Sequence, residues 1–167
     1  DVLDLFSGSG SLGIEALSRG AQCGLFIDSN IQAVRIIKDN LRRCGFVTRS
    51  NLWRVDAIRA LHHMADQPCR VDLILSDPPY GDPVVQKIID TVSTCSMLTP
   101  DGLLIIEHQK KVSPETPETG LVLRRRKDFG DTTLSVYEPD LTPSMSLPNP
   151  SLVSPVDLPP PYSRSRQ

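Results

Sequence analysis

Long hydrophobic runs are absent from this 167-residue sequence, and a helix that crosses a bilayer needs about 20 consecutive apolar residues. No membrane partner is therefore predicted. The sequence also lacks a secretion signal, because it begins directly with an apolar, strand-like stretch at Asp1, and it has no initiator methionine. We therefore expect a cytoplasmic protein, and we expect a further segment to precede Asp1.

Closely spaced cysteines are absent as well. The four cysteines form no Cys-x-x-Cys pair and no Cys/His spacing of the kind found in zinc sites. No metal is predicted, and we expect reduced, mostly buried thiols. An excess of one charge is also lacking, since the formal net charge is −2. Any surface that binds nucleic acid must therefore be local.

Apolar runs and amphipathic stretches alternate along most of the chain. Buried strands are predicted at 1–6, 23–27, 51–55, 71–75 and 103–107, and helices at 12–19, 31–44, 57–64 and from 83 onward. This alternation predicts an α/β fold, in which a doubly wound, Rossmann-like, mostly parallel sheet of about seven strands carries helices on both faces. The last two strands, 121–127 and 132–137, have no helix between them, so we expect an antiparallel strand at one edge.

Short polar signals punctuate these elements. Ser29 or Asn30 is a candidate cap for the helix over 31–44, and Asp82 is a candidate cap with Pro83 in the first helical position. Thr99-Pro100-Asp101-Gly102 predicts a turn before the fifth strand.

The pattern stops at about residue 140. Residues 1–139 are predicted to form one domain, and residues 140–167 are rich in proline and serine without any periodicity. Such composition favours a disordered or polyproline-like tail. Within it, Pro159-Pro160-Pro161-Tyr162 matches the short proline-rich ligands of WW domains.

A glycine loop follows the first strand. Gly8-Ser9-Gly10-Ser11-Leu12-Gly13 has the Gly-x-Gly-x-x-Gly spacing, and Asp28 follows Gly8 at the distance expected for an acid that binds ribose hydroxyls. These features indicate a cofactor that contains a nucleoside. A carboxylate at Asp4 faces an anionic pyrophosphate badly, whereas it suits the cationic amino-acid end of S-adenosylmethionine. Asp56, at the tip of the third strand, suits an adenine amino group or a helix cap.

A rigid acidic hook follows the fourth strand. The strand over 71–75 places the carboxylate of Asp77 where open α/β sheets bind ligands. Pro78 and Pro79 fix the backbone in an extended form. Such a hook suits a flat group with an NH2, because Asp77 and the Pro78 carbonyl accept its two hydrogens and Tyr80 stacks on its face. Glu107, at the tip of the fifth strand, could approach the site, although a surface carboxylate is the favoured interpretation.

The two motifs together carry a family resemblance. Asp4-Leu5-Phe6-Ser7-Gly8-Ser9-Gly10 with Asp77-Pro78-Pro79-Tyr80 resembles the class I S-adenosylmethionine-dependent amino-methyltransferases. The longer run from Asp4 to Ala21, and Phe129-Gly130-Asp131-Thr132 near the end, resemble the RsmD family in particular. Its members methylate the exocyclic N2 of a guanine in small-subunit (16S) ribosomal RNA, and they carry an additional segment before the first strand.

The resemblance implies roles for particular residues. Asp77, Pro78 and Tyr80 are the predicted catalytic residues, and Pro79 is predicted to contact the substrate. The predicted cofactor residues are Asp4, Phe6, Ser7, Gly8, Gly10, Asp28, Asp56 and Ala57. The partner is ribosomal RNA or the small-subunit particle, for which the cluster Arg124, Arg125 and Arg126 is the predicted basic contact. The resemblance also favours a monomer.

Three alternatives remain open from the sequence. The same chemistry could act on adenine N6 in DNA or RNA, or on a protein glutamine. The glycine loop could serve an NAD-dependent oxidoreductase, which Asp4 and the proline hook argue against. The proline-rich tail could belong to a non-catalytic interaction protein.

Overall fold

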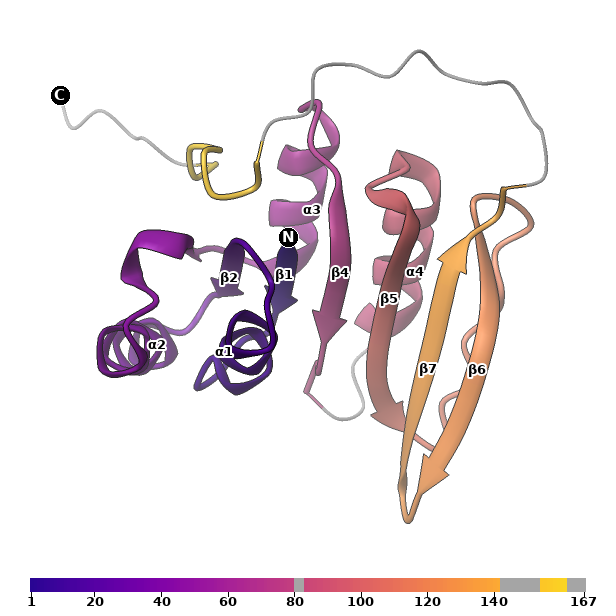
Figure 1. Ribbon diagram of the computed structural model, residues 1–167. Helices are drawn as coiled ribbons and strands as arrows, with labels where there is room; N and C mark the ends of the chain where they lie inside the picture. The colour runs from indigo at the N-terminus through magenta and orange to yellow at the C-terminus, as the bar shows by residue number, and fades with distance from the viewer. Residues whose placement is uncertain (80–82, 142–153, 162–167) are drawn as a thin grey trace, which may run out of the picture.

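The computed structural model describes residues 1–79, 83–141 and 154–161, and it has the α/β architecture predicted from the sequence (Figure 1). Among these residues, seven strands form one sheet in the order β3-β2-β1-β4-β5-β7-β6. In chain order the elements are β1 (Val2–Leu5), α1 (Ser11–Ser18), β2 (Gly24–Asp28), α2 (Ile31–Cys44), the 3-10 helix η1 (Val47–Arg49), β3 (Ser50–Arg54), α3 (Ala57–Ala65), β4 (Val71–Ser76), α4 (Val84–Cys95), β5 (Leu98–Gln109), β6 (Leu121–Phe129) and β7 (Thr132–Pro139).

The direction of the strands confirms the Rossmann-like prediction. Strands β1 to β5 pair in parallel, whereas β7 runs antiparallel to both of its neighbours, β5 and β6. The chain builds outward from β1 to β2 and β3 on one side, then returns to build β4 and β5 on the other. The strand order therefore reverses at β1 and β4, which is the place where open α/β sheets bind ligands.

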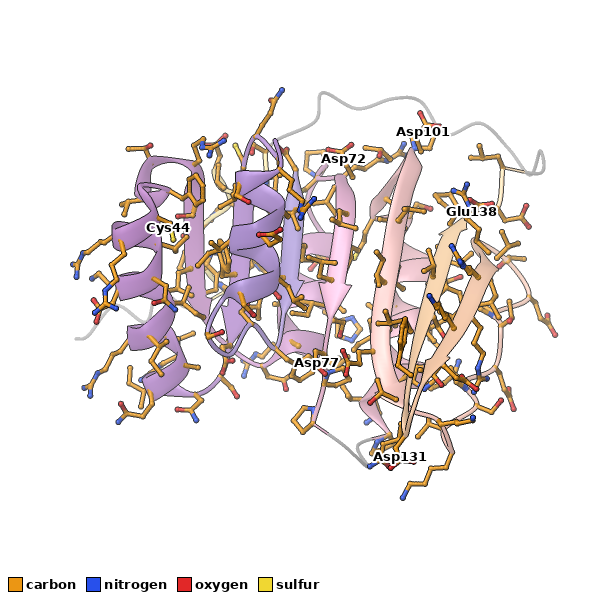
Figure 2. The ribbon with its side chains drawn as sticks, turned by 60° about the horizontal axis from the view of Figure 1, so that its bottom comes forward. Cys44, Asp72, Asp77, Asp101, Asp131 and Glu138 are labelled. Carbon is orange, nitrogen blue, oxygen red and sulfur yellow. The ribbon has the colours of Figure 1, made fainter. Side chains whose placement is uncertain are left out.

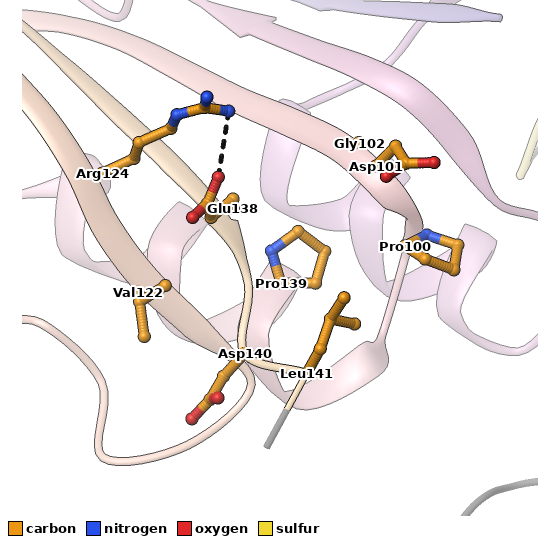
Figure 3. A pocket seen from close by; sticks show the side chains of 9 residues that line it. All are labelled: Pro100, Asp101, Gly102, Val122, Arg124, Glu138, Pro139, Asp140 and Leu141. Atoms are coloured by element: carbon orange, nitrogen blue, oxygen red, sulfur yellow. Dashed lines mark ion pairs between the residues drawn. The ribbon is translucent and has the colours of Figure 1, made fainter. Parts of the chain in front are cut away.

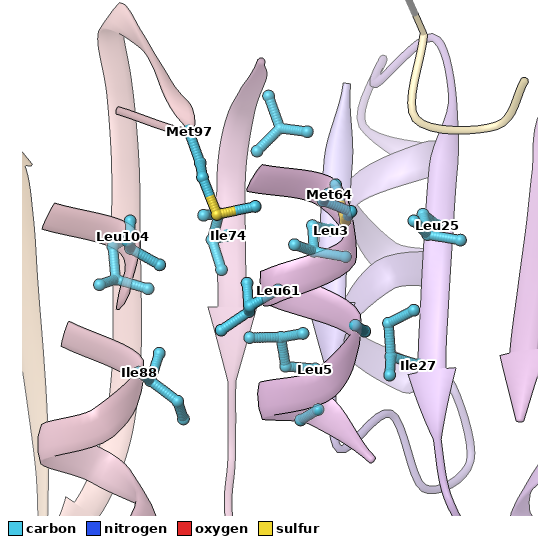
Figure 4. Close-up of a cluster of buried hydrophobic side chains, with 14 of the residues drawn as sticks. Leu3, Leu5, Leu25, Ile27, Leu61, Met64, Ile74, Ile88, Met97 and Leu104 are labelled. Carbon is cyan, nitrogen blue, oxygen red and sulfur yellow. The ribbon is translucent and has the colours of Figure 1, made fainter. Parts of the chain in front are cut away.

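Two apolar clusters cover the two faces of the sheet, because neighbouring side chains on a strand point to opposite faces. On β2, Leu25 and Ile27 join the larger cluster, which packs against α3 and α4, whereas Phe26 joins a smaller one that packs against α1 and α2. Figure 4 shows the larger cluster, with Leu61 of α3 and Ile88 of α4 over the strands. The prediction of helices on both faces is confirmed.

The face of the sheet that packs against α1 and α2 is covered only in part. In the described residues, α1 and α2 lie over β1, β2 and β3, while β4, β5 and β7 carry no helix on that side (Figure 2). Leu75, Ile105, Leu134 and Val136 are only half-buried there, and the surface that they form is called the open sheet face below. The described helices are also too short or too polar for any of them to cross a bilayer.

Several local predictions are confirmed and others need correction. Asn30 caps α2, because its side-chain oxygen accepts a hydrogen bond from the Gln32 N–H at 2.8 Å. The sequence predicted Pro83 as the first residue of the helix, whereas in the structure Pro83 is the capping residue and α4 begins at Val84. Asp82 lies outside the described residues.

The predicted turn over 99–102 is wrong, because β5 is continuous through it. Val71 of β4 pairs with Leu98 of β5, and Leu73 pairs with Leu103, so four residues of β5 stand opposite one residue of β4. Pro100 has no N–H to donate, which suits a strand segment that leaves the ladder of hydrogen bonds. The turn residues therefore mark a bulge inside the strand.

The thiols follow the prediction in part. All four cysteines are free; Cys69 is buried, Cys23 and Cys95 are half-buried, and Cys44 is exposed at the end of α2. Ile31, at the other end of α2, is also exposed, since α2 covers the sheet mainly through Ile37 and Leu41.

Residues 154–161, which belong to the predicted tail, pack against the domain. Leu158 is 4% exposed and belongs to the larger apolar cluster. The Asn51 side-chain amide donates to the carbonyl oxygens of Val156 at 2.9 Å and Leu158 at 3.2 Å. A ring nitrogen of His63 lies 3.1 Å from the Pro159 carbonyl oxygen. A single docked leucine leaves no periodic pattern, so composition alone hides it. Tyr162 lies outside the described residues.

We expect the docked segment to stabilise the whole domain. Leu158→Ala should lower the free energy of unfolding by about 2 kcal/mol or more, because it leaves a cavity in the larger cluster. Leu141→Ala is the matched control, since Leu141 is 66% exposed and its truncation should cost less than about 0.5 kcal/mol. Urea denaturation of both variants measures the difference. Equal stability of the two variants would contradict docking of the segment.

Candidate active site

The predicted site residues gather where the parallel strands end. The glycine loop leaves β1 at Leu5, Asp28 is the last residue of β2, and Asp77 follows the last residue of β4. Because β1 lies between β2 and β4, these three features are neighbours across the point where the strand order reverses. Figure 2 shows Asp77 at this rim of the sheet and Asp72 and Asp101 at the opposite rim.

Ser7 joins the ends of β1 and β2. Its hydroxyl donates to the Asp4 carbonyl oxygen at 2.7 Å and accepts from the Ile27 N–H at 2.9 Å. Its own N–H donates to the Ile27 carbonyl oxygen at 3.0 Å, and its carbonyl oxygen accepts from the Gly10 N–H at 2.6 Å. Ser7 is 7% exposed. The structure therefore assigns the Ser7 side chain to holding the loop in place.

Backbone conformation turns the loop sharply at two glycines and one aromatic residue. Gly8 and Gly10 have φ values of 56° and 78°, and Phe6 also has a positive φ of 56°. A side chain other than glycine in this region costs about 1 kcal/mol or more. At Gly10 a Cβ would also lie 3.3 Å from the Ile37 side chain. The loop therefore needs glycine at this point to lie against α2.

Asp28 links the glycine loop to the start of α2. One carboxylate oxygen accepts from the Gly8 N–H at 2.9 Å, and the other accepts from the Asn30 N–H at 2.8 Å. A carboxylate oxygen has more than one acceptor position, so these two bonds leave positions for a further donor such as a hydroxyl group.

Asp4 is the most deeply buried acid of the site. It is 1% exposed, and its Oδ2 accepts from the Gly13 N–H at 2.9 Å. Burial raises its pKa to about 7, the Gly13 hydrogen bond opposes this, and the charges of Asp28 and Asp77 raise it further. Near neutral pH a cationic group that approaches Asp4 would favour the ionised carboxylate.

The third strand contributes a helix cap. Asp56 lies between β3 and α3, and its side chain accepts from the Arg59 N–H at 3.0 Å. Ala57, the first residue of α3, is buried. Both of the roles that the sequence leaves open for Asp56 remain compatible with this position, and the capping role is confirmed.

The acidic hook stands beside the glycine loop. Asp77 and Pro79 are exposed and Pro78 is buried, whereas Tyr80 lies outside the described residues. Partial burial raises the pKa of Asp77. A carboxylate that has lost part of its water is a stronger acceptor for an N–H group that replaces the water.

Glu107 lies next to Asp77, the less favoured of the two interpretations that the sequence left open for it. Ser76 pairs with Ile106, so the next residues along, Asp77 and Glu107, are neighbours. Partial burial raises the pKa of Glu107, and the charge of Asp77 raises it further. The predicted end of the fifth strand at Glu107 was the available signal; β5 continues to Gln109, and the strand order was needed to place Glu107 beside β4.

The structure does not bring the arginine cluster together with Asp77. The cluster lies on the edge strand β6, three strands from β4, which is about 14 Å at the usual spacing. Arg124 pairs with Glu138 at 3.0 Å, and Arg126 donates to the Lys110 carbonyl oxygen at 3.3 Å.

A hollow of about 700 Å³ lies beside Arg124, between the start of β5 and the end of β7 (Figure 3). Pro100 and Asp101 line one side, and residues Glu138 to Leu141 line the other. This hollow is lined by residues of the bulge in β5 and lies toward the rim opposite Asp77. Its volume is therefore no guide to the chemistry of the glycine loop.

We expect Gly13 to accept no side chain. A Cβ there would lie 2.5 Å from Cε1 of Phe26 and 2.9 Å from Oδ2 of Asp4, so Gly13→Ala should push α1 away from the sheet and cost about 1–3 kcal/mol. Gly24→Ala is the control, because its nearest contact is 3.1 Å from the same ring. Thermal melting of both should rank Gly13→Ala as clearly less stable. The reverse ranking would contradict this packing.

We expect Asp4 to make stability depend on pH. Its pKa is raised from 3.8 to about 7, so the unfolded chain loses this proton first and the free energy of unfolding falls as the pH rises through that range. The linked loss is roughly 4 kcal/mol. In Asp4→Asn the side-chain oxygen can still accept from the Gly13 N–H, and no buried group has to ionise. The free energy of unfolding of this variant relative to the parent, measured with urea, should therefore rise from pH 4 to 7 and then level off. A constant difference would contradict the raised pKa.

Comparisons with known proteins agree with this architecture. A solved structure of a conserved hypothetical protein from Streptococcus pyogenes is 31% identical, with a TM-score of 0.74 over 83% of this chain and 85% of that one. The Bacillus subtilis protein YlbH is 38% identical over 138 residues, which are 81% of this chain and 74% of YlbH. Ribosomal RNA small subunit methyltransferase D of Haemophilus influenzae is 29% identical over 140 residues, which are 83% of this chain and 71% of that protein.

A family match covers the chain from its first residue into β7. The sequence profile of one family matches residues 1–138, and this range contains the glycine loop, the acidic hook and the β6–β7 hairpin. The chain therefore belongs to the family described as Conserved hypothetical protein 95.

Proposed function

We propose that this chain transfers a methyl group from S-adenosylmethionine to the exocyclic N2 amine of a guanine in small-subunit (16S) ribosomal RNA. The observation that carries the proposal is the position of Asp77, at the end of β4, beside the glycine loop that leaves β1. The name of the Haemophilus influenzae relative, a ribosomal RNA small subunit methyltransferase, supports the same reaction.

The residues of the glycine loop suit this cofactor. The buried Asp4 offers a carboxylate to a cationic amino group, and Asp28 keeps acceptor positions for hydroxyl groups. Asp4, Asp28 and Asp77 lie close enough for the last two to raise the pKa of the first. This concentration of negative charge disfavours an anionic pyrophosphate, so the geometry argues against a dinucleotide and an NAD-dependent oxidoreductase.

The cofactor supplies a methyl group on a positively charged sulfur, which is already electrophilic. The chain's own part is to hold and orient the acceptor. Asp77 and the Pro78 carbonyl accept the two N–H bonds of the amine, and the stiff backbone of Pro78 and Pro79 fixes both acceptors. The nitrogen lone pair then faces the glycine loop. Positioning of this kind supplies much of the rate gain in well-oriented reactions. In this proposal Tyr80 stacks on the base.

The acceptor base must leave its stack to reach a hook of this kind, so the proposed substrate is an unpaired or flipped nucleotide. The proposed partner is ribosomal RNA or the small-subunit particle, and the proposal places a monomer in the cytoplasm. Adenine N6 and a protein glutamine have the same NH2 group, and the acceptor assay described next distinguishes them from guanine.

We expect Asp77→Ala to lower methyl transfer from labelled S-adenosylmethionine to small-subunit RNA by about 10²-fold or more, because the amine loses its charged acceptor. Cofactor affinity, measured by calorimetry, should stay within about threefold. Asp101→Ala is the control, since Asp101 is an exposed aspartate at the opposite rim (Figure 2). Digestion of the product should place the label on guanine. Weaker cofactor binding with unchanged transfer per bound cofactor would overturn the role of Asp77, and label on adenine would overturn the acceptor.

A further inference from the structure

The turn of the β6–β7 hairpin carries an exposed aromatic ring beside a cation. The strands join through two residues, Gly130 and Asp131, and Gly130 has a φ of 59° that suits glycine. Phe129, the last residue of β6, is 50% exposed. The Lys127 ammonium lies 4.8 Å from the centre of the Phe129 ring, a distance typical of a cation–π contact.

The register of the sheet places this turn at the same rim as the candidate active site. From Asp77 a single row of residues crosses the sheet, because Glu107 follows the Ser76–Ile106 pair, Glu107 pairs with Leu134, and Leu134 pairs with Lys127. Three strand spacings separate the ends of this row, or about 14 Å. Figure 2 shows Asp77 and Asp131 at the same rim, and Figure 1 shows the turn reaching beyond the end of β4.

Alternation along β6 sorts its charges between two faces. Arg125 pairs with Val136 and Lys127 pairs with Leu134, so both lie on the side of the open sheet face, and Phe129 follows in the same alternation. Asp128 lies on the other side, where it accepts from the Thr133 hydroxyl at 2.7 Å and pairs with Lys110 at 3.1 Å.

Asp128 is therefore paired with Thr133 and Lys110 on the face opposite the Phe129 ring. Within the described parts of the chain, none of the ion pairs involves Arg125 or Lys127. Asp131, in the turn itself, is exposed and is two residues from Phe129 in the sequence. The tip of β6 therefore presents two cations and one aromatic ring on this face, with Asp131 in the turn and Glu107 two strands away on β5.

We propose that this hairpin tip, formed by Arg125, Lys127 and Phe129, binds the single strand of RNA that flanks the target base. Phe129 stacks on an unpaired base, and Lys127 and Arg125 contact the neighbouring phosphates. Exposed aromatic rings set among cations are the usual means of holding single-stranded RNA, because every base has a face to stack and every nucleotide has a negative charge. The inference rests on the proposed function, since it takes RNA as the substrate.

The proposal separates the arginines that the sequence treats as one cluster. Arg124 is an extra residue in β6, because Leu123 pairs with Tyr137 while Arg125 pairs with the next residue of β7, Val136. Its guanidinium pairs with Glu138 and lines the hollow away from the active-site rim (Figure 3). Arg124 therefore serves as a control for Lys127, since both are cations exposed on the same strand.

The experiment measures binding of a fluorescent single-stranded RNA by anisotropy, together with methyl transfer to small-subunit RNA. Phe129→Ala should weaken binding and raise the KM for RNA about tenfold, the factor expected for one base–aromatic stack. Lys127→Ala should lower the slope of log affinity against log salt by about 0.7, the value for one phosphate contact on a single strand. Lys127→Arg should restore that slope. Arg124→Ala should change the affinity and the KM for RNA by no more than about twofold, and it should leave the slope unchanged.

The outcomes distinguish this inference from the proposed function. If the parent chain transfers methyl groups and Phe129→Ala has the same KM and affinity as Arg124→Ala, the hairpin inference is overturned and the proposed function stands. If the parent chain binds RNA in a manner that depends on Phe129 but transfers no methyl group, the proposed function fails and the hairpin inference stands. Melting temperatures within a few degrees of the parent show that the exposed substitutions leave the fold intact.

Discussion

The site depends on the hydrogen bonds that Ser7 makes between β1 and β2. A buried hydroxyl that accepts from one strand and donates to the other fixes the spacing of two strand ends. The same residue closes the glycine loop through its carbonyl oxygen. The glycine loop that begins at Ser7 positions the Asp28–Gly8 hydrogen bond and the hydrogen bond from Gly13 to Asp4.

Negative charge is concentrated at this rim against its own electrostatic cost. Asp4, Asp77 and Glu107 all have raised pKa values, with burial as the first cause and neighbouring carboxylates as further causes for Asp4 and Glu107. Groups with perturbed pKa values are typical of functional sites. The domain balances this cost elsewhere, through the larger apolar cluster and the segment at 154–161 that joins it.

The sequence predicted the fold and the motifs well, because both depend on local patterns. The strands, the Asn30 cap and the position of Asp77 follow from periodicity and from residue types. The docking of Leu158 and the nearness of Glu107 to Asp77 depend on contacts between distant parts of the chain, which no short window contains. The arginine cluster was predicted as a unit for the same reason, since pairing with β7 decides which face each side chain takes. Tyr80 stays a prediction.

The extra residue at Arg124 affects how this hairpin is aligned with those of other chains. Leu123 pairs with Tyr137 before the extra residue, and Arg125 pairs with Val136 after it. A residue can therefore be inserted or removed at this point of β6 without changing which face the paired residues occupy. Two chains with the same run of basic residues, one with the extra residue and one without it, would then present different side chains at the tip. Equivalent positions at the tip are therefore found by counting backward from the Gly130 turn rather than forward from the start of β6.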